Sequence, residues 1–149
     1  MKKKILLLIF IVNNLFSQNA YDLDLTFNPG TGIPSGTRIR KSIFNQNQNK
    51  IYCVGTFTTF NGLSYNKLVR LNIDGSVYNT LNIGTGFNGE TFDVIIQDDG
   101  KIIVGGDFTS YNGIQRNGLV RLNSNGTIDN TLNIGTGFLT TLSGTSTHS

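Results

Sequence analysis

Short apolar runs alternate with polar turn residues along most of this chain. In the clearest part, apolar and β-branched residues dominate Phe92–Gln97 and Lys101–Phe108, and Asp98-Asp99-Gly100 stands between them. Runs of about four to eight such residues bounded by Gly, Asn or Asp are typical of β-strands. An Asp-Gly pair between two of them predicts a hairpin turn of type I′. The pattern therefore predicts antiparallel strands rather than helices.

Four strands are predicted in each unit of the pattern. In the second unit they are Phe92–Gln97, Lys101–Phe108, Leu119–Asn123 and Thr127–Leu132, with Asn112-Gly113 and Asn125-Gly126 at turns. In the first unit they are Ser42–Gln46, Lys50–Phe57, Leu68–Asn72 and Ser76–Leu81, with Asp74-Gly75 at the last turn. Asn49 stands where the second unit has Gly100, and Asn is the non-Gly residue that best tolerates positive φ.

The two units are copies of one sequence. Lys50–Phe87 matches Lys101–Phe138 at a constant offset of 51 residues, with 23 of 38 positions identical. Thr26–Ile33 is a degenerate copy of Thr80–Phe87, so it resembles the end of a further repeat. We therefore divide the chain into a partial repeat (residues 21–33) and two repeats (34–87 and 88–138).

The apolar run Ile102–Gly106 predicts a strand that is covered on both faces. Four antiparallel strands per repeat, stacked face to face with the next repeat, are typical of β-propeller blades. The predicted fold is all-β: two four-stranded antiparallel propeller-like blades plus a partial N-terminal blade strand, an incomplete β-propeller. Two blades cannot close a ring. We expect a fragment of a longer propeller, because the chain begins and ends in mid-repeat; assembly of several copies is the alternative.

One long stretch resembles a known repeat. Val94–Phe108, followed by Leu119–Asn123 and Asn125-Gly126, is similar to the delta-60 repeat of exported bacterial proteins. The resemblance covers both repeats and the fragment, although the first copy has Asn49 and Val54 in place of two glycines. It implies export and a multi-repeat architecture, usually in longer chains, and it implies no reaction.

The N-terminus has the pattern of a secretory signal peptide, predicted as residues 1–17. Lys2, Lys3 and Lys4 precede the apolar run Ile5–Val12, and cleavage is expected after Ser17. The run is shorter than the roughly 20 residues of a membrane-spanning helix, so no membrane span is expected after cleavage. The predicted location is secreted or cell surface, and residues 139–149 are expected to form a poorly ordered tail.

Charge and cysteine content give no support for a protein that binds nucleic acid or for a fold held by disulfides. Three of the 12 Lys and Arg lie in the signal and all 9 acidic residues lie beyond it, so the mature chain is near neutral. This gives no support for binding nucleic acid or anionic membranes. Cys53 is the single cysteine, so no intrachain disulfide can form. It aligns with Val104 and is predicted to be a small buried hydrophobe.

The residues predict no catalytic group, metal site or cofactor. His148, the single histidine, lies beside the C-terminus. Asp98-Asp99 is better explained by a turn than by a carboxylate pair. The Asn-x-Asp-Gly and Asn-x-Asn-Gly turns lack the alternating carboxylates and the closing bidentate Glu of calcium loops, and the first copy has Tyr78 in place of Asp129. Gly84-x-Gly86 is not followed by the residues of a phosphate loop.

Candidate binding residues cluster in the loops between the second and third strands. Aromatic, amide and cationic groups together suit a glycan or protein ligand, and the candidates are Phe60, Asn61, Tyr65, Tyr111, Asn112 and Arg116. The alternative, which we favour, is that Phe60 and Tyr111 pack between blades while the Asn-Gly pairs turn the chain. The predicted function is a non-catalytic scaffold or binding module whose partners are a ligand or further propeller repeats. The alternative is a lectin-like carbohydrate-binding propeller closed by oligomerisation.

Overall fold

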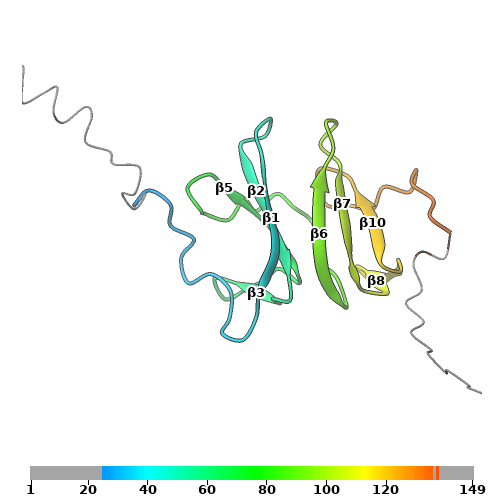
Figure 1. The fold of residues 1–149 in the computed structure, drawn as a ribbon, viewed down its shortest axis with the longest axis horizontal. Helices are drawn as coiled ribbons and strands as arrows, with labels where there is room; N and C mark the ends of the chain where they lie inside the picture. Colours follow the sequence, from blue (N-terminus) through cyan, green and yellow to red (C-terminus); the bar gives the residue numbers. More distant parts are fainter. Residues whose placement is uncertain (1–24, 136, 138–149) are drawn as a thin grey trace, which may run out of the picture.

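A computed structural model describes residues 25–135 and 137 of the chain. Among these residues it contains strands, turns and bends and no helix, which confirms the all-β prediction. Figure 1 shows two groups of strands side by side, one for each sequence repeat. The predicted signal peptide, the predicted tail and His148 lie outside the described residues.

Each repeat folds into a three-stranded antiparallel sheet with a small hairpin beside it. The sheet orders are β1-β2-β5 and β6-β7-β10, and the hairpins are β3-β4 and β8-β9. The first repeat contains β1 (Ile39–Asn45), β2 (Lys50–Gly55), β3 (Thr59–Phe60), β4 (Leu63–Ser64) and β5 (Leu68–Asn72). The second contains β6 (Glu90–Ile96), β7 (Ile102–Asp107), β8 (Ser110–Tyr111), β9 (Ile114–Gln115) and β10 (Leu119–Leu122).

The predicted fourth strand of each blade is reduced to a single bridge. The bridges join Leu71 to Val77 and Leu122 to Ile128. The rest of Ser76–Leu81 and of Thr127–Leu132 is turn or irregular backbone. In the second repeat Oδ1 of Asp129 accepts hydrogen bonds from the N–H of Thr131 (2.9 Å) and from its hydroxyl (2.7 Å). Such local bonds compete with a strand ladder in the second repeat, whereas the first repeat has Tyr78 at this position and also pairs no further.

The hairpin turns differ from the type I′ prediction. Between β6 and β7 Gly100 has positive φ (81°), and its N–H donates to the carbonyl oxygen of Gln97 (2.9 Å). This is a three-residue loop that ends in a left-handed glycine. The type I′ pattern occurs instead in the small hairpin, where Asn112 (50°) and Gly113 (74°) both have positive φ. Asn49 has a φ of 53°, as predicted from its place opposite Gly100.

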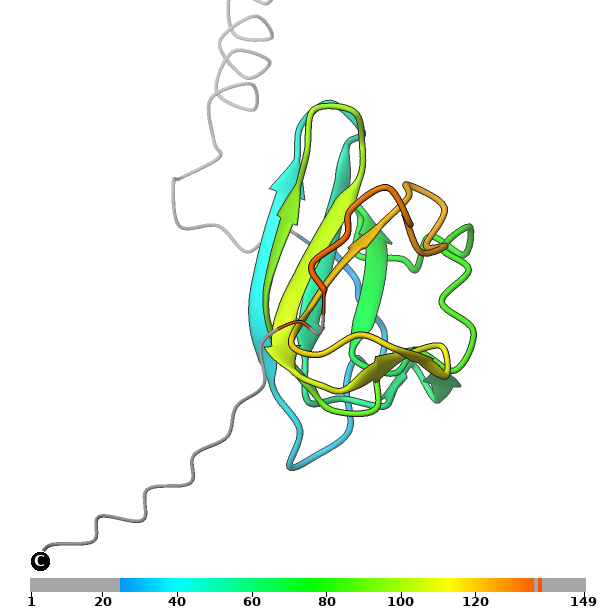
Figure 2. The ribbon, with the colours of Figure 1, turned by 90° about the vertical axis from the view of Figure 1, so that its right-hand side faces the viewer.

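The two sheets stack face to face, with β1 and β6 as neighbours across the contact (Figures 1 and 2). The core between them contains Tyr52, Val54 and Leu68 from the first repeat and Val94, Ile102, Val104, Val120 and Leu122 from the second. On the far face of the second sheet Ile95 is 53% exposed and Ile103 is half-buried. The strand β2 is therefore covered on both faces. The strand β7, which contains the run Ile102–Gly106 that was predicted to be covered on both faces, has one open face. This is the arrangement of an incomplete propeller.

A smaller core covers the other face of the first sheet. It contains Cys53, Phe57, Phe60, Val69 and Leu71, and Ile33 of the partial repeat packs against it. Phe87, at the end of the first repeat, packs against the second repeat in the equivalent way, with its ring centroid 4.7 Å from that of Phe108 and 4.6 Å from that of Tyr111. Residues 25–33 contain no strand, so the partial repeat covers the first sheet with turns instead.

Linker segments connect each repeat to the one before it. We use this name for residues 28–32, which precede the first repeat, and 82–86, which precede the second. The N–H of Asn28 donates to the carbonyl oxygen of Asp74, and the N–H of Asn82 donates to that of Asn125, both at 2.7 Å. The partial repeat therefore docks on the first repeat as the first repeat docks on the second.

Candidate functional site

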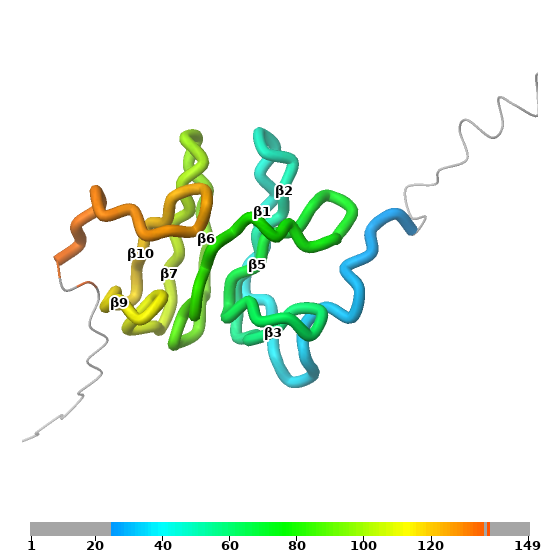
Figure 3. The backbone as a smooth tube through the Cα atoms, turned by 180° about the vertical axis from the view of Figure 1, so that it is seen from behind, coloured from blue at the N-terminus to red at the C-terminus, as the bar shows by residue number. Residues whose placement is uncertain are grey.

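The aromatic residues predicted as ligand contacts lie in the core. Phe60 is 2% exposed and Tyr111 is 1% exposed. The hydroxyl of Tyr111 donates to the carbonyl oxygen of Gly126 at 2.6 Å, and burial raises the pKa of this phenol. Their positions match the favoured alternative, in which both rings pack between repeats. Figure 3 shows the small hairpins that carry them at the same end of both repeats.

The predicted amides, Asn61 and Asn112, hold the linker segments. Oδ1 of Asn61 accepts a hydrogen bond from the N–H of Gly32 (2.8 Å), and Oδ1 of Asn112 accepts one from the N–H of Thr85 (3.1 Å). In the opposite direction, the N–H of Asn61 donates to the carbonyl oxygen of Gly32 and the N–H of Asn112 donates to that of Gly86, both at 2.8 Å. Both amides therefore join consecutive repeats.

Tyr65 and Arg116 occupy the same position in the two repeats and each reaches an asparagine of its own repeat. The hydroxyl of Tyr65 donates to Oδ1 of Asn79 (2.7 Å), and Nη2 of Arg116 donates to Oδ1 of Asn130 (2.9 Å). Burial raises the pKa of Tyr65. The six candidates are thus divided between two hairpins, where each bonds or packs within the chain. As ligand contacts they stay predictions.

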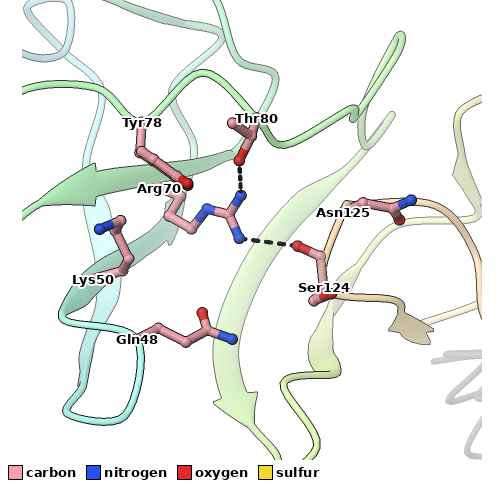
Figure 4. A pocket seen from close by; sticks show the side chains of 7 residues that line it. All are labelled: Gln48, Lys50, Arg70, Tyr78, Thr80, Ser124 and Asn125. Carbon is pink, nitrogen blue, oxygen red and sulfur yellow. Dashed lines mark hydrogen bonds between the residues drawn. The ribbon is translucent and has the colours of Figure 1, made fainter.

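A pocket that the sequence did not reveal lies between the first sheet and a turn of the second repeat. Its volume is about 450 Å³, and it is lined by Gln48, Lys50, Arg70, Tyr78, Thr80, Ser124 and Asn125. Figure 4 shows Arg70 at its centre, with Lys50 and Tyr78 on one side and Ser124 and Asn125 on the other. We call it the Arg70 pocket.

Arg70 is buried, with 5% of its surface exposed, and neutral oxygens surround its guanidinium. Nη1 donates to the hydroxyl of Tyr52 (3.1 Å) and to the carbonyl oxygen of Ser124 (2.9 Å), and Nη2 donates to the hydroxyl of Thr80 (2.5 Å). Nε is buried and has no hydrogen-bond partner among the described residues. An unsatisfied buried donor of a charged group is costly, so this atom requires an explanation.

Lys50 brings a second positive charge to the pocket. Its Nζ lies 4.5 Å from the ring centroid of Tyr78, and the guanidinium carbon of Arg70 lies 4.8 Å from the same centroid. Neither cation forms an ion pair with a carboxylate of the described residues. Among the nearby acids, Asp74 is the one whose pKa is affected by the charge of Lys50. Its pKa is lowered chiefly by hydrogen bonds from Ser76, with Lys50 contributing less.

The second repeat has a carboxylate at the corresponding place. A shift of 51 residues converts Lys50, Arg70 and Tyr78 into Lys101, Arg121 and Asp129. The backbone N–H of Tyr78 or Asp129 donates to the carbonyl oxygen of the arginine of its own repeat, at 2.8 Å in the first and 2.9 Å in the second. This backbone hydrogen bond is therefore kept in both repeats, while the side chain that follows it changes from tyrosine to aspartate.

Asp129 pairs with Arg121 and Lys101, the equivalents of Arg70 and Lys50. Its Oδ2 lies 2.8 Å from Nε of Arg121 and 3.3 Å from Nζ of Lys101. Hydrogen bonds from Thr131, with further ones from Lys101 and Arg121, hold the pKa of Asp129 well below its usual range. The Nε atom that meets this carboxylate in Arg121 is the atom that has no partner among the described residues in Arg70.

Two other residues considered in the sequence analysis, Cys53 and Asp99, have structural roles. Cys53 is 4% exposed and burial raises the pKa of its thiol to about 11, which confirms the prediction of a buried hydrophobe. Oδ1 of Asp99 accepts a hydrogen bond from the N–H of Lys101 (3.1 Å), as expected of a turn residue. Among the described residues no group of three or more His, Cys, Asp and Glu is placed to hold a metal ion. No helix in the described part of the chain is long and apolar enough to cross a membrane.

Comparison with known proteins identifies the class of repeat. The sequence model of one family, described as a β-propeller domain of unknown function (DUF5122), matches residues 46–77 and 97–132. The two matched segments lie in the two repeats, and the chain is similar to that family over both. The chain is thus built of propeller-type repeats, which confirms the predicted fold class. Comparisons with curated proteins and with solved structures found no match.

Proposed function

We propose that this chain is an exported, non-catalytic β-propeller module that serves as a scaffold or binding surface within a larger extracellular or cell-surface assembly. One observation carries the proposal: both described repeats receive a linker segment through the same contacts. The side chains of Asn61 and Asn112 bind the linkers, and the turns at Asp74 and Asn125 accept a bond from them. Such nearest-neighbour docking stacks repeats in series, which is how repeat proteins build extended binding surfaces.

Export is supported by the N-terminal sequence. A basic start, Lys2–Lys4, is followed by the apolar run Ile5–Val12 and a polar stretch that ends near Ser17. The resemblance of Val94–Phe108 to the delta-60 repeat of exported bacterial proteins supports the same location.

A non-catalytic role is supported by the use of the described charged side chains. Asp99 and Asp129 both pair with Lys101, and Asp129 also pairs with Arg121. A general base needs a free acceptor within hydrogen-bond reach of the substrate. These carboxylates already accept bonds that hold turns, so they suit structural roles better than proton transfer.

The lectin-like alternative is favoured by the open face of the second sheet. Ile95 is 53% exposed there and Leu119 is half-buried, whereas Leu68, the equivalent of Leu119, is fully buried against the second repeat. A second copy of the chain could cover this face, so that several copies close a ring with equivalent pockets.

Light scattering on residues 18–149, followed by a glycan array, tests the two proposals. The scaffold proposal predicts a monomer or concentration-dependent association, whereas closure by oligomerisation predicts one discrete multimer at all concentrations. Both proposals predict that a ligand found on the array is recovered chemically unchanged after incubation with the protein. Turnover of a bound glycan or peptide would contradict the non-catalytic role in either case.

A further inference from the structure

We infer that the Arg70 pocket binds the carboxylate of an acidic sugar such as a uronate, with the carboxylate held by Lys50 and Arg70. The inference rests on the proposed binding role and names the ligand class of one site. It is carried by the position beside the arginine, which is Tyr78 in the first repeat and Asp129 in the second. A second difference is Gln48, which stands where the second repeat has Asp99, the other partner of Lys101.

The second repeat shows what the two cations bind when a carboxylate is present. There Asp129 meets Nε of Arg121 at 2.8 Å and Nζ of Lys101 at 3.3 Å. The first repeat keeps both cations, as Arg70 and Lys50, and has the uncharged ring of Tyr78 against them instead of a carboxylate. A ligand carboxylate would therefore restore a pairing that the same fold already makes elsewhere in the chain.

In Arg70 the donor without a partner is Nε, the same atom that meets the carboxylate of Asp129 in Arg121. Nε of Arg70 is buried without a partner among the described residues, while both Nη atoms of this side chain donate to neutral oxygens. Charge-assisted bonds from a guanidinium to a carboxylate are stronger than bonds to neutral acceptors. Because Nε is buried next to the ring of Tyr78, an anion would reach it only when that ring turns aside; it would then satisfy this donor and offset the charges of Arg70 and Lys50.

The remaining surface of the pocket suits a sugar. The ring of Tyr78 offers an aromatic face, and the side chains of Gln48, Thr80 and Asn125 offer amide and hydroxyl groups. The volume of about 450 Å³ falls within the usual span of small-molecule sites, roughly 300 to 1,000 Å³. A ring face next to several neutral hydrogen-bonding groups favours a polyhydroxylated ligand over a purely inorganic anion.

Titration of the isotope-labelled full chain with sodium galacturonate tests this inference, with galactose as the neutral match. Galacturonate should shift the NMR signals of Lys50, Arg70 and Tyr78, and it should bind at least about tenfold more tightly than galactose because of the charge-assisted bonds. Added salt should weaken galacturonate binding, because the pocket is open to solvent ions. Equal affinity for the two sugars would overturn the inference.

Two variants of Tyr78 form a matched pair. Tyr78→Asp should place a carboxylate beside Arg70 and Lys50, as Asp129 does in the second repeat, and abolish galacturonate binding. Tyr78→Asn has nearly the same size as aspartate and no charge, so it should retain binding that Tyr78→Asp loses. Equal loss in both variants would show that the ring, and not the unpaired charge, forms the site.

Lys50→Met provides an independent test at a partly exposed position at the start of β2. It should weaken galacturonate binding by at least about tenfold and leave the far-UV spectrum unchanged. Tighter binding of N-acetylglycine than of galacturonate would overturn the sugar assignment and make the partner a peptide carboxylate. Equally tight binding of inorganic sulfate would overturn selectivity for carboxylates. None of these binding results changes the oligomeric state measured by light scattering. The carboxylate inference can therefore fail while the module proposal holds.

Discussion

At the scale of single residues, Asp129 shows how one carboxylate organises the edge of a sheet. Its Oδ1 accepts two hydrogen bonds from Thr131, and its Oδ2 pairs with Arg121 and Lys101. Both carboxylate oxygens of Asp129 therefore already have partners within the chain. Because every partner favours the ionised form, its pKa lies well below the usual range.

We expect Asp129→Asn to lower the free energy of unfolding at neutral pH, because Arg121 loses its carboxylate and Lys101 keeps only Asp99. Since the folded-state pKa is depressed, the stabilisation is complete above the unfolded-state pKa of about 3.9 and is lost as the pH falls further. In urea unfolding, the difference between wild type and variant should be constant near neutral pH and shrink below about pH 4. A difference that persists unchanged at lower pH would rule out the ion pairs as its source.

Cys53 should be unreactive in the folded chain. Its thiol is 4% exposed and burial raises its pKa to about 11, so little thiolate is present at pH 8. We expect alkylation by iodoacetamide to be at least about a hundredfold slower in buffer than in urea. Comparable rates in the two solvents would mean that the first sheet opens readily around this residue.

The sequence predicted the environment of Cys53 but missed the Arg70 pocket. Alignment of Cys53 with Val104 was enough to indicate a buried hydrophobe. Replacement of Asp129 by Tyr78 was also visible, and it was used only as evidence against a calcium loop. Its effect on Arg70 depends on contacts between segments that lie far apart in the sequence, such as the bond from Arg70 to Ser124. No local pattern contains that information.

At the scale of elements, the linker segments depend on glycines in the turns that receive them. Gly126 has a φ of 90°, and a Cβ added there would lie 2.9 Å from the carbonyl oxygen of Asn82. Gly75 is in the same situation against Asn28 and Pro29 of the preceding linker. These glycines allow the backbone of one repeat to approach the backbone of the next.

Gly126→Ala should therefore cost more stability than Gly113→Ala. Gly113 also has positive φ (74°), but its Cβ would meet nothing within 4 Å. We expect Gly113→Ala to cost about 1–2 kcal/mol from backbone conformation alone. Gly126→Ala should cost a further 1–3 kcal/mol, roughly, because the linker must shift. Urea unfolding of both variants measures the comparison, and equal costs would mean that the linker adapts freely.

The strand pattern was predicted better than the turns and the outer edges. Apolar runs locate the three main strands of each repeat, because burial on one or both faces fixes their composition. The fourth strand was overpredicted in both repeats, where pairing ends after one bridge, and in the second repeat Asp129 bonds locally to Thr131 instead. The Asp-Gly turns were assigned to the wrong type, because a glycine at the last loop position fits a three-residue loop equally well.

At the scale of the whole molecule, the two repeats bury one face of each sheet against each other and leave another face open. Leu68 is fully buried between the sheets, and its equivalent Leu119 is half-buried on the open side. Exposure of Ile95 on the same face adds apolar surface that a following repeat would cover. The sequence predicted this incomplete propeller from the repeat count, because stacking requires a neighbour for every blade.

The most direct test of stacking is urea unfolding of a chain that carries an additional copy of residues 88–138 after Phe138. The new repeat should receive residues 133–137, which match the linker 82–86 in sequence, and should cover Ile95 and Leu119. We therefore predict one cooperative transition with a higher midpoint and a steeper slope than the original chain shows, because more surface is buried in a single unit. Two separate transitions, with the original midpoint unchanged, would contradict the account and show that the repeats fold as independent units.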